Sequence, residues 1–503
     1  MIEGILIGLQ TALSFKNLMM VMIGCFAGTI IGMLPGLGPM TAIALMIPIT
    51  YGFDPSTGLI LMAGVYYGAV FGGSTSSILI NAPGVPGTVA TSFDGYPMAQ
   101  QGKAGKALAI AAYSSFAGGT ISAIFLLIAA PSLSLISLSF RSPDYFGLMI
   151  LGLTAVAAFS SKGNFLKAMM MVVLGLMLAS VGQDTLSDIP RFTFNNMNLS
   201  DGISFVLVVM ATFAMTEALT LIFKAKDPTK AAKDISLSQL GSIKLDKTET
   251  KKMVTTIPRS SVLGFIVGVL PGAGATIASF LAYGMERNFV NDEEKQKFGK
   301  GSVNGIAAPE TANNAACSGS FVPLLTLGIP GSGTTAVMLG ALLGFGIQPG
   351  PRLYQTNPEI FWSVIMSMYI GMVVLLILNL PLIPYIARVL ATPRTFLIPL
   401  ILFFSLTGVY LMSFNNFDIY LMIGIAVVAT VLRLYNFPMP PLILAFVLGG
   451  LMEENLRRSL LISDGSWSFL WDRPLTVIIM ITILAIVSWQ IFRSFRRKNS
   501  SML

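Results

Sequence analysis

The stretch "GTIIGMLPGLG", residues 28–38, recurs as "GFIVGVLPGAG", residues 264–274. The glycines and the proline keep one spacing in the two copies, so that Gly28, Gly32, Pro35, Gly36 and Gly38 fall on Gly264, Gly268, Pro271, Gly272 and Gly274. A second pair follows in the same order, because "GVPGTVAT" from Gly84 matches "GIPGSGTT" from Gly328 after one insertion. Duplicated hydrophobic segments that are interrupted at corresponding places are typical of secondary transporters, and the interruptions mark the binding site. The sequence therefore predicts two membrane repeats whose breaks build one site.

The composition around these motifs is that of a membrane protein. Of the 503 residues, 54% are hydrophobic and 11% are charged, whereas soluble domains have about 25% charged residues. A spanning helix needs about 20 mostly apolar residues. Long uncharged stretches are found at 17–53, 107–140, 260–285, 311–351, 360–387, 395–417 and 474–492. We expect an all-α polytopic membrane protein with roughly 10–12 transmembrane helices, together with re-entrant hairpins and broken helices.

Basic residues concentrate in two places. Residues 224–259 hold nine Lys or Arg against four acidic residues, and the tail 493–503 adds four more with no acidic residue. The positive-inside rule places both segments in the cytoplasm, so the net charge of +8 indicates topology and not a nucleic-acid site. We expect a first membrane repeat at 1–223, a cytoplasmic linker at 224–259, an inverted second repeat at 260–492 and a cytoplasmic tail at 493–503. Basic residues on both sides of 264–284 predict a re-entrant hairpin there.

Several classes of chemistry are disfavoured. The chain has no histidine, and Cys25 and Cys317 lie in apolar sequence. Histidine is the commonest metal ligand and general base, so we expect no enzyme, no cofactor and no metal beyond a coupling ion. Neither "QQGKAGKAL" nor "KFGKGS" has the spacing of a P-loop, which favours an ion gradient over ATP as the energy source. A channel or an intramembrane protease is the alternative from another class, although neither a ring of charge nor a catalytic pair is evident.

The breaks themselves predict the site. In hydrocarbon, irregular backbone is tolerated only where protein or a water-filled cavity surrounds it. A Pro-Gly break frees carbonyls that can bind a cation, and N–H groups at a new helix start that favour an anion. Neutral hydroxyls and amides flank the breaks and can hold a carboxylate. The predicted substrate-binding residues are Ser74, Thr75, Ser76, Asn81, Gly84, Gly87, Thr88, Thr91, Asn313, Asn314, Thr326, Gly328, Gly331, Ser332, Thr334 and Thr335. The predicted cation-binding residues are Gly36, Gly38, Thr41, Gly272, Gly274, Thr276 and Glu310.

Two acidic residues lie within apolar sequence. Glu217 comes shortly before Lys224, and we interpret it as an end-of-helix charge that reaches water. Glu310 either caps a helix N-terminus or ligates a cation. Because the candidate site is rich in carbonyls and hydroxyls and poor in titratable groups, sodium is favoured as the coupling ion, with the proton as the alternative. A site without fixed positive charge accepts an anion well only when the cation is bound, which couples the two.

Long motifs carry a family resemblance. The segments "GMLPGLGP", "GAVFGGSTSSILINAPGVPGTVATSFDGYPMAQQGKAGKAL", "APETANNAACSGSFVPLLTLGIPGSGTTAVMLGAL" and "PRFTF" resemble the large membrane subunit of the tripartite tricarboxylate transporters, the TctA family. The resemblance implies a permease that lies in the lipid bilayer of the bacterial inner membrane. It also implies a di- or tricarboxylate or related substrate, a periplasmic solute-binding protein and a small TctB-like membrane subunit. Together with the repeats, it implies elevator-type movement of one half-site bundle against a fixed scaffold.

Overall fold

The computed structural model describes residues 2–160, 165–184, 187–223, 241–391 and 394–500. Residues 224–240 of the predicted linker and the last three residues of the tail lie outside the described part of the chain. In that part, one short antiparallel sheet pairs β1 (Gly182–Gln183) with β2 (Pro190–Arg191), and the regular elements are otherwise helical. The all-α prediction is confirmed.

The first half contains ten α-helices and four short 3-10 or π-helical segments within the described residues. They are α1 (Ile2–Ala12), α2 (Phe15–Met33), α3 (Gly38–Thr50), α4 (Pro55–Ile80), η1 (Pro86–Thr88), α5 (Val89–Met98), η2 (Ala99–Lys103), α6 (Ala104–Ser137), α7 (Ser142–Ser160), α8 (Phe165–Ala179), η3 (Met197–Leu199), α9 (Phe205–Val209), η4 (Met210–Met215) and α10 (Thr216–Phe223).

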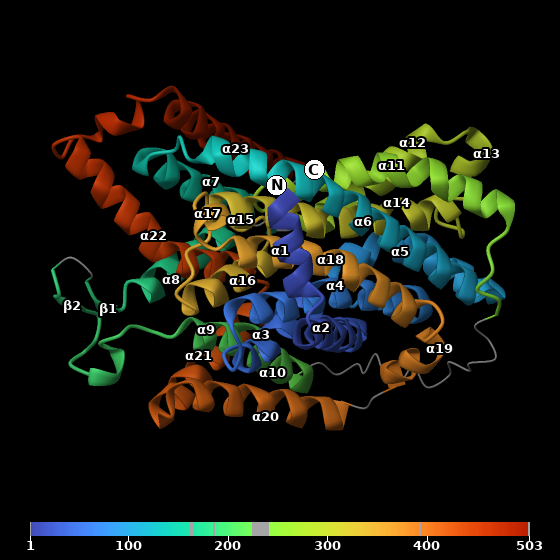
Figure 1. Cartoon of the computed structure of the whole chain (residues 1–503), viewed down its shortest axis with the longest axis horizontal. Helices are drawn as coiled ribbons and strands as arrows, with labels where there is room; N and C mark the ends of the chain where they lie inside the picture. Colours follow the sequence, from blue (N-terminus) through green and yellow to red (C-terminus); the bar gives the residue numbers. More distant parts are fainter. Residues whose placement is uncertain (1, 161–164, 185–186, 224–240, 392–393, 501–503) are drawn as a thin grey trace.

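The second half begins with α11 inside the predicted linker. Its elements are α11 (Lys247–Val269), α12 (Gly274–Phe289), α13 (Asp292–Lys295), α14 (Val303–Gly319), α15 (Phe321–Leu327), α16 (Gly333–Gly344), α17 (Leu353–Thr356), α18 (Pro358–Asn379), α19 (Ile383–Ile386), η7 (Ala387–Ala391), α20 (Arg394–Ser413), α21 (Asn416–Leu434), α22 (Pro440–Ile462), η8 (Trp467–Leu470) and α23 (Pro474–Ser500). The small sheet lies at one end of the molecule, and α13 lies at the opposite end (Figure 1).

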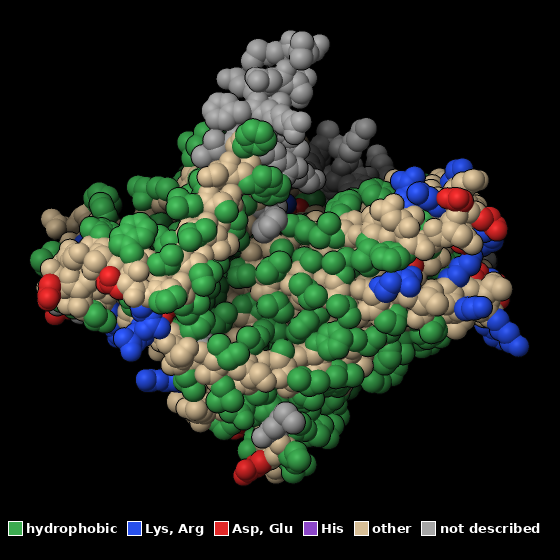
Figure 2. Space-filling view, turned by 90° about the horizontal axis from the view of Figure 1, so that it is seen from above, with side chains coloured by type: hydrophobic (Ala, Val, Ile, Leu, Met, Phe, Trp, Pro, Cys, Tyr) green, Lys and Arg blue, Asp and Glu red, His purple; other side chains and the backbone are tan. Residues whose placement is uncertain are grey.

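The length and composition of the helices make the chain a multi-pass membrane protein. Seven helical segments of the described residues are long and apolar enough to cross a membrane, and six shorter apolar helices accompany them. Hydrophobic side chains cover the middle of the face seen in Figure 2, whereas Lys, Arg, Asp and Glu gather at its two ends. That distribution fits an apolar band between two aqueous faces. The expected total of 10–12 crossings stays a prediction.

The glycines of the opening motif act as packing surfaces. In the first half α2 packs on α4, and in the second half α11 packs on α14. A Cβ added at Gly28 would lie 2.3 Å from the Val65 carbonyl oxygen, and one at Gly264 would lie 2.5 Å from the Ala312 carbonyl oxygen. Only glycine lets the helix backbones approach so closely, as in the small-residue contacts of other membrane helices.

The two Leu-Pro-Gly breaks have the same backbone. Gly36 and Gly272 have φ of 96° and 82°, and Gly38 and Gly274 have φ of 65° and 62°. These are left-handed conformations that favour glycine. Each break turns the chain from a long helix, α2 or α11, into a following helix, α3 or α12.

In the second pair of breaks, the residues that match in the structure differ from those that match in the sequence. The helices before them end in left-handed caps at Asn81 (φ 51°) and Gly328 (φ 69°). A Cβ added at Gly84 would lie 1.8 Å from the Gly32 carbonyl oxygen, and one at Gly331 would lie 2.9 Å from the Gly268 carbonyl oxygen. The structural counterpart of Gly84 is therefore Gly331 and not Gly328, because contact with the preceding motif sets the register.

Residues 264–284 lie in a helix-break-helix hairpin, and α11 and α12 pack on each other. Near their outer ends, Thr256 and Arg259 of α11 bond the Glu286 carboxylate of α12 at 2.8 and 2.7 Å. The hairpin then leads through α13 into α14. The re-entrant placement of this hairpin in the membrane stays a prediction.

Candidate functional site

Three hydroxyl groups converge on one buried carboxylate. Glu310 lies in the middle of α14 and is 0% exposed. Thr91 of α5 donates to its Oε1 at 2.5 Å, and Ser74 of α4 and Ser115 of α6 donate to its Oε2 at 2.7 and 2.8 Å. No Lys or Arg in the described ranges forms an ion pair with Glu310. A buried carboxylate is costly unless a positive charge compensates it, so these four residues, the Glu310 cage, have the chemistry of a cation site.

A small cavity adjoins the cage. It has a volume of about 10 Å³ and is lined by Ser74, Ser115, Thr75 and Asn379 among others. That volume is near the minimum that holds one water molecule. The Oδ1 atom of Asn379 has no hydrogen-bond partner in the described structure. Further oxygen ligands are therefore within reach of the cage.

Two amides on α14 have polar atoms without a partner among the described residues, and one of them faces Gly87 in the break that follows α4. Asn313 is 1% exposed, and neither its Oδ1 nor its Nδ2 has a partner among the described residues. A Cβ added at Gly87 would lie 2.3 Å from Asn313 Oδ1, so this amide faces the break. Asn314 donates to the Glu310 carbonyl at 3.1 Å, and its Oδ1 is likewise unpaired. Leaving buried polar atoms unpaired is costly, so these amides are candidate contacts for a ligand or an ordered water.

The two breaks of the second half are joined to each other. The N–H of Gly272 donates to the Gly331 carbonyl at 3.0 Å. Ser332 caps the start of α16 by accepting from the Thr335 N–H at 3.2 Å, and its hydroxyl lies 3.4 Å from the Tyr66 hydroxyl of α4. The start of α16 therefore faces the first half through Tyr66.

The breaks of the first half line a cavity of about 510 Å³. Three predicted cation ligands, Gly36, Gly38 and Thr41, meet the predicted substrate residue Gly84 there. The opposite wall comes from the loop between α21 and α22, and Glu217 and Arg433 also line the cavity. The structure therefore brings together the two motifs of the first half, which are far apart in the sequence.

The expectation for Glu217 is wrong. Glu217 does not reach water, because its side chain is 1% exposed and pairs with Arg433 of α21. Its place at the start of α10, directly after the π-helical segment η4, turns it toward the break: a Cβ added at Gly36 would lie 2.7 Å from its Oε1. Arg433 lines the same cavity, where the Glu217 carboxylate balances its positive charge.

Several predicted substrate residues are engaged locally. Hydroxyls of Ser/Thr in helices commonly bond the carbonyl three or four residues earlier. Such bonds to preceding carbonyls are made by Ser76, Thr88, Thr326 and Thr335. Asn81 is exposed and serves as a left-handed helix cap. Thr334 is buried and Thr276 half-buried, but the described contacts give neither of them a part in the cage.

The sequence analysis missed three residues of these sites. Ser115 lies outside the repeated motifs, in a largely apolar helix. Tyr66 has the apolar surroundings of a core residue, and Arg433 lies in the last turn of a helix that is far from the motifs in the sequence. Only the helix packing places them here. Arg433 gave the strongest signal of the three in the sequence, because basic residues within membrane segments are uncommon.

Known proteins resemble this chain over most of its length. A protein of Agrobacterium vitis described as an uncharacterized 52.8 kDa protein is 40% identical over 502 residues, which cover 100% of this chain and 98% of the relative. Another uncharacterized protein of Agrobacterium vitis is 40% identical over 239 residues, covering 48% of this chain and 98% of that protein. No solved structure matches the chain significantly. The tripartite tricarboxylate transporter TctA family matches residues 18–444, and the chain belongs to this transporter family.

Proposed function

We propose that the chain is the permease subunit of an ion-gradient-driven secondary transporter that imports a di- or tricarboxylate or a related organic acid. The observation that carries this proposal is the Glu310 cage, a fully buried carboxylate held by hydroxyls from three helices. A transporter that uses a cation gradient needs such a site for the cation, next to a place for the anion.

Sodium is the favoured coupling ion. Hard cations prefer oxygen ligands, and the cage offers two carboxylate oxygens and three hydroxyl oxygens. Each hydroxyl keeps lone pairs for a cation while it bonds the carboxylate. The carbonyls of the Leu-Pro-Gly breaks at Gly36, Gly38, Gly272 and Gly274 are the candidates for a second cation site.

The substrate carboxylates are proposed to bind at the breaks next to the cage, near Gly87 and Ser332. The unpaired amide of Asn313 next to Gly87 offers both a donor and an acceptor. Ser332 at the start of α16 adds a hydroxyl close to Tyr66, and helix-start N–H groups favour anions. A cation in the Glu310 cage would favour an anion beside it, and Asn313 and Asn314 lie within the next four residues of the same helix, α14.

Partners, location and movement follow from the family and from the repeated breaks. Tripartite systems of this family work with a periplasmic solute-binding protein and a small membrane subunit, in the bacterial inner membrane. The matching φ angles at the glycines of the two Leu-Pro-Gly breaks support a structural repeat, and the basic residues beside the second half support its inversion. Elevator-type movement of the half-site bundle against the remaining helices is the proposed transport step.

Proton coupling is the second candidate, because the carboxylate of Glu310 could carry a proton across the membrane instead of holding sodium. A channel is the candidate from another class. Exchange of labelled for unlabelled carboxylate across proteoliposomes separates a carrier from a channel, since a channel gives no counterflow. Uptake that needs sodium at a fixed proton gradient supports sodium coupling, whereas undiminished uptake without sodium rules it out.

A further inference from the structure

A second large cavity lies at the end of the molecule that carries the small sheet. Its volume is about 530 Å³, and its walls come from the start of α7, the loop before α17 and the end of α22. Arg457 of α22 pairs with Asp184, next to β1, which places this cavity beside the sheet. The cavity that the first-half breaks line has different walls, so this is a separate chamber.

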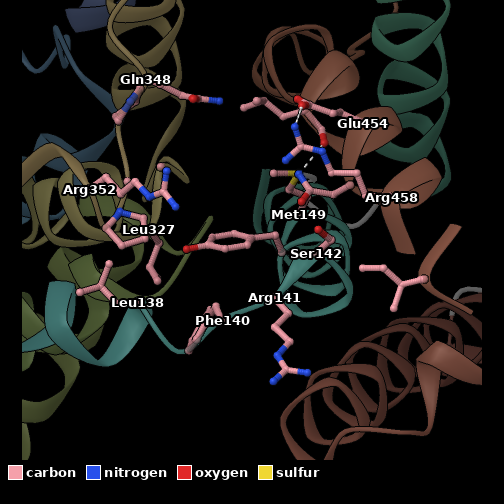
Figure 3. Close-up of a pocket in the computed structure, with 18 residues that line it drawn as sticks. Leu138, Phe140, Arg141, Ser142, Met149, Leu327, Gln348, Arg352, Glu454 and Arg458 are labelled. Carbon is pink, nitrogen blue, oxygen red and sulfur yellow. Dashed lines mark hydrogen bonds and ion pairs between the residues drawn. The ribbon is translucent and has the colours of Figure 1, made fainter. Parts of the chain in front are cut away.

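The walls of this cavity carry an excess of positive charge. Arg141, Arg352 and Arg458 are lining residues against one acidic residue, Glu454; Figure 3 shows the Arg141 guanidinium directed away from the other three, so Arg352 supplies the unbalanced charge inside the cavity. Arg458 pairs with Glu454 on the same helix, but both side chains are largely exposed, at 62% and 45%, so the pair contributes little. Arg141 and Arg352 form no ion pair within the described part of the chain.

The arrangement of the side chains suits an anion. Figure 3 shows Arg352 and Gln348 reaching into the cavity from one wall, with Arg458 and Glu454 on the wall across from them. Arginine has a planar fork of donors that matches a carboxylate in two-point contacts. The volume of about 530 Å³ falls in the range of about 300–1,000 Å³ that small-molecule sites occupy.

The cavity is connected to the second break. Leu327 and Gly328, the last residue of α15 and its left-handed cap, form part of the lining. A Cβ added at Gly328 would lie 2.5 Å from the Pro349 carbonyl oxygen, so the loop that carries Gln348 and Arg352 rests directly on this cap. The residues after the cap lead to Ser332 at the start of α16. The break therefore runs from this cavity to the proposed substrate site.

We propose that this cavity is a second carboxylate site, which holds a small di- or tricarboxylate through Arg352 before the anion passes to the breaks. The proposal rests on the proposed transport function. By the positive-inside rule the cavity opens to the periplasm, since the basic flanks of α11 lie at the opposite end. Because Arg352 has no acidic partner in the described structure, this site should bind the anion without sodium, unlike the proposed substrate site beside the Glu310 cage.

Sodium dependence separates the two sites experimentally. Binding of labelled citrate and labelled succinate is measured on the purified full chain in nanodiscs, once in sodium chloride and once in choline chloride at equal ionic strength. The wild-type chain is expected to bind in choline through the Arg352 cavity alone. Arg352→Gln should weaken that sodium-free binding about tenfold or more, as expected for loss of a hydrogen bond to a charged group, and Arg352→Lys should restore part of it.

A control variant completes the experiment. Arg388→Gln removes an exposed arginine of η7 that lies over the Tyr385 ring of α19, and it should leave sodium-free binding unchanged. If folded Arg352→Gln binds both probes in choline as the wild type does, or if the wild type binds only with sodium, the second site is refuted while the transport function stands. A folded wild-type chain that neither binds nor exchanges any carboxylate overturns the proposed function and this inference with it.

Discussion

Replacing Thr91 by valine removes one hydroxyl from the Glu310 cage and keeps the shape of the side chain. Thr91 is 0% exposed, and its hydroxyl donates to Glu310 Oε1 at 2.5 Å. It is the only hydroxyl on that carboxylate oxygen within the described structure, because Ser74 and Ser115 both bond Oε2. The variant therefore changes one side of the cage alone.

The two candidate ions give opposite expectations for this variant. For sodium, Thr91 is an oxygen ligand, and its loss should weaken sodium binding. A hydrogen bond to a charged group contributes about 1.5–3 kcal/mol, which corresponds to roughly a 10- to 100-fold higher sodium concentration for half-maximal uptake. For a proton, loss of a donor to the ionised carboxylate should instead strengthen proton binding, so proton-driven uptake would persist to a higher pH.

The assay is uptake of labelled citrate into proteoliposomes, with sodium concentration and external pH varied independently. Thr430→Val is the matched control, because the hydroxyl of this buried threonine bonds the Ala426 carbonyl of its own helix at 2.7 Å. The reasoning is refuted if folded Thr91→Val has the sodium dependence and the pH dependence of the wild type. Such a result would mean that the cage only stabilises the packing of α14.

Three further predictions concern stability and charge. Gly84→Ala should lower the thermal unfolding temperature of the detergent-solubilised chain, since overpacking costs about 1–3 kcal/mol or more. Gly424 has open space around it, so Gly424→Ala should not lower that temperature. Equal unfolding temperatures of the two variants would contradict the close packing at Gly84. Arg433→Gln should destabilise the chain by about 1.5–3 kcal/mol, the contribution of a hydrogen bond to a charged group, because it removes the guanidinium that pairs with the buried Glu217 carboxylate. Adding Glu217→Gln should restore stability, and a double variant as unstable as the single one would exclude a stabilising role for this ion pair. Asp94→Asn should speed hydrogen exchange in the loop before α14, where the carboxylate accepts three backbone N–H groups, and unchanged exchange rates there would contradict this.

The sequence predicted the breaks well because they depend on local chemistry. Proline and glycine change the backbone wherever they stand, and the breaks at Gly36 and Gly272 were found by spacing alone. The register of the second pair was not predictable, because it is set by contact of Gly84 and Gly331 with the preceding motifs. That contact depends on how the helices pack.

Side chains were predicted less well than the backbone. Ser74, Thr91 and Glu310 were all named, and the structure brings them together. Ser/Thr hydroxyls can bond their own helix as readily as a ligand, and sequence does not distinguish Thr326, which bonds the carbonyl of Val322, from Thr91. The pairing of Glu217 with Arg433 joins helices that are far apart in the chain, so no local pattern announces it.

The Glu310 cage divides its members unequally between the halves. All three hydroxyl groups come from the first half, and the carboxylate comes from the second. A gene cut within codons 224–240 would therefore yield two polypeptides, of which one has the hydroxyls without the acid and the other has the acid without the hydroxyls. The proposed cation site would therefore be incomplete in either fragment alone, and co-expression of the two should reconstitute it.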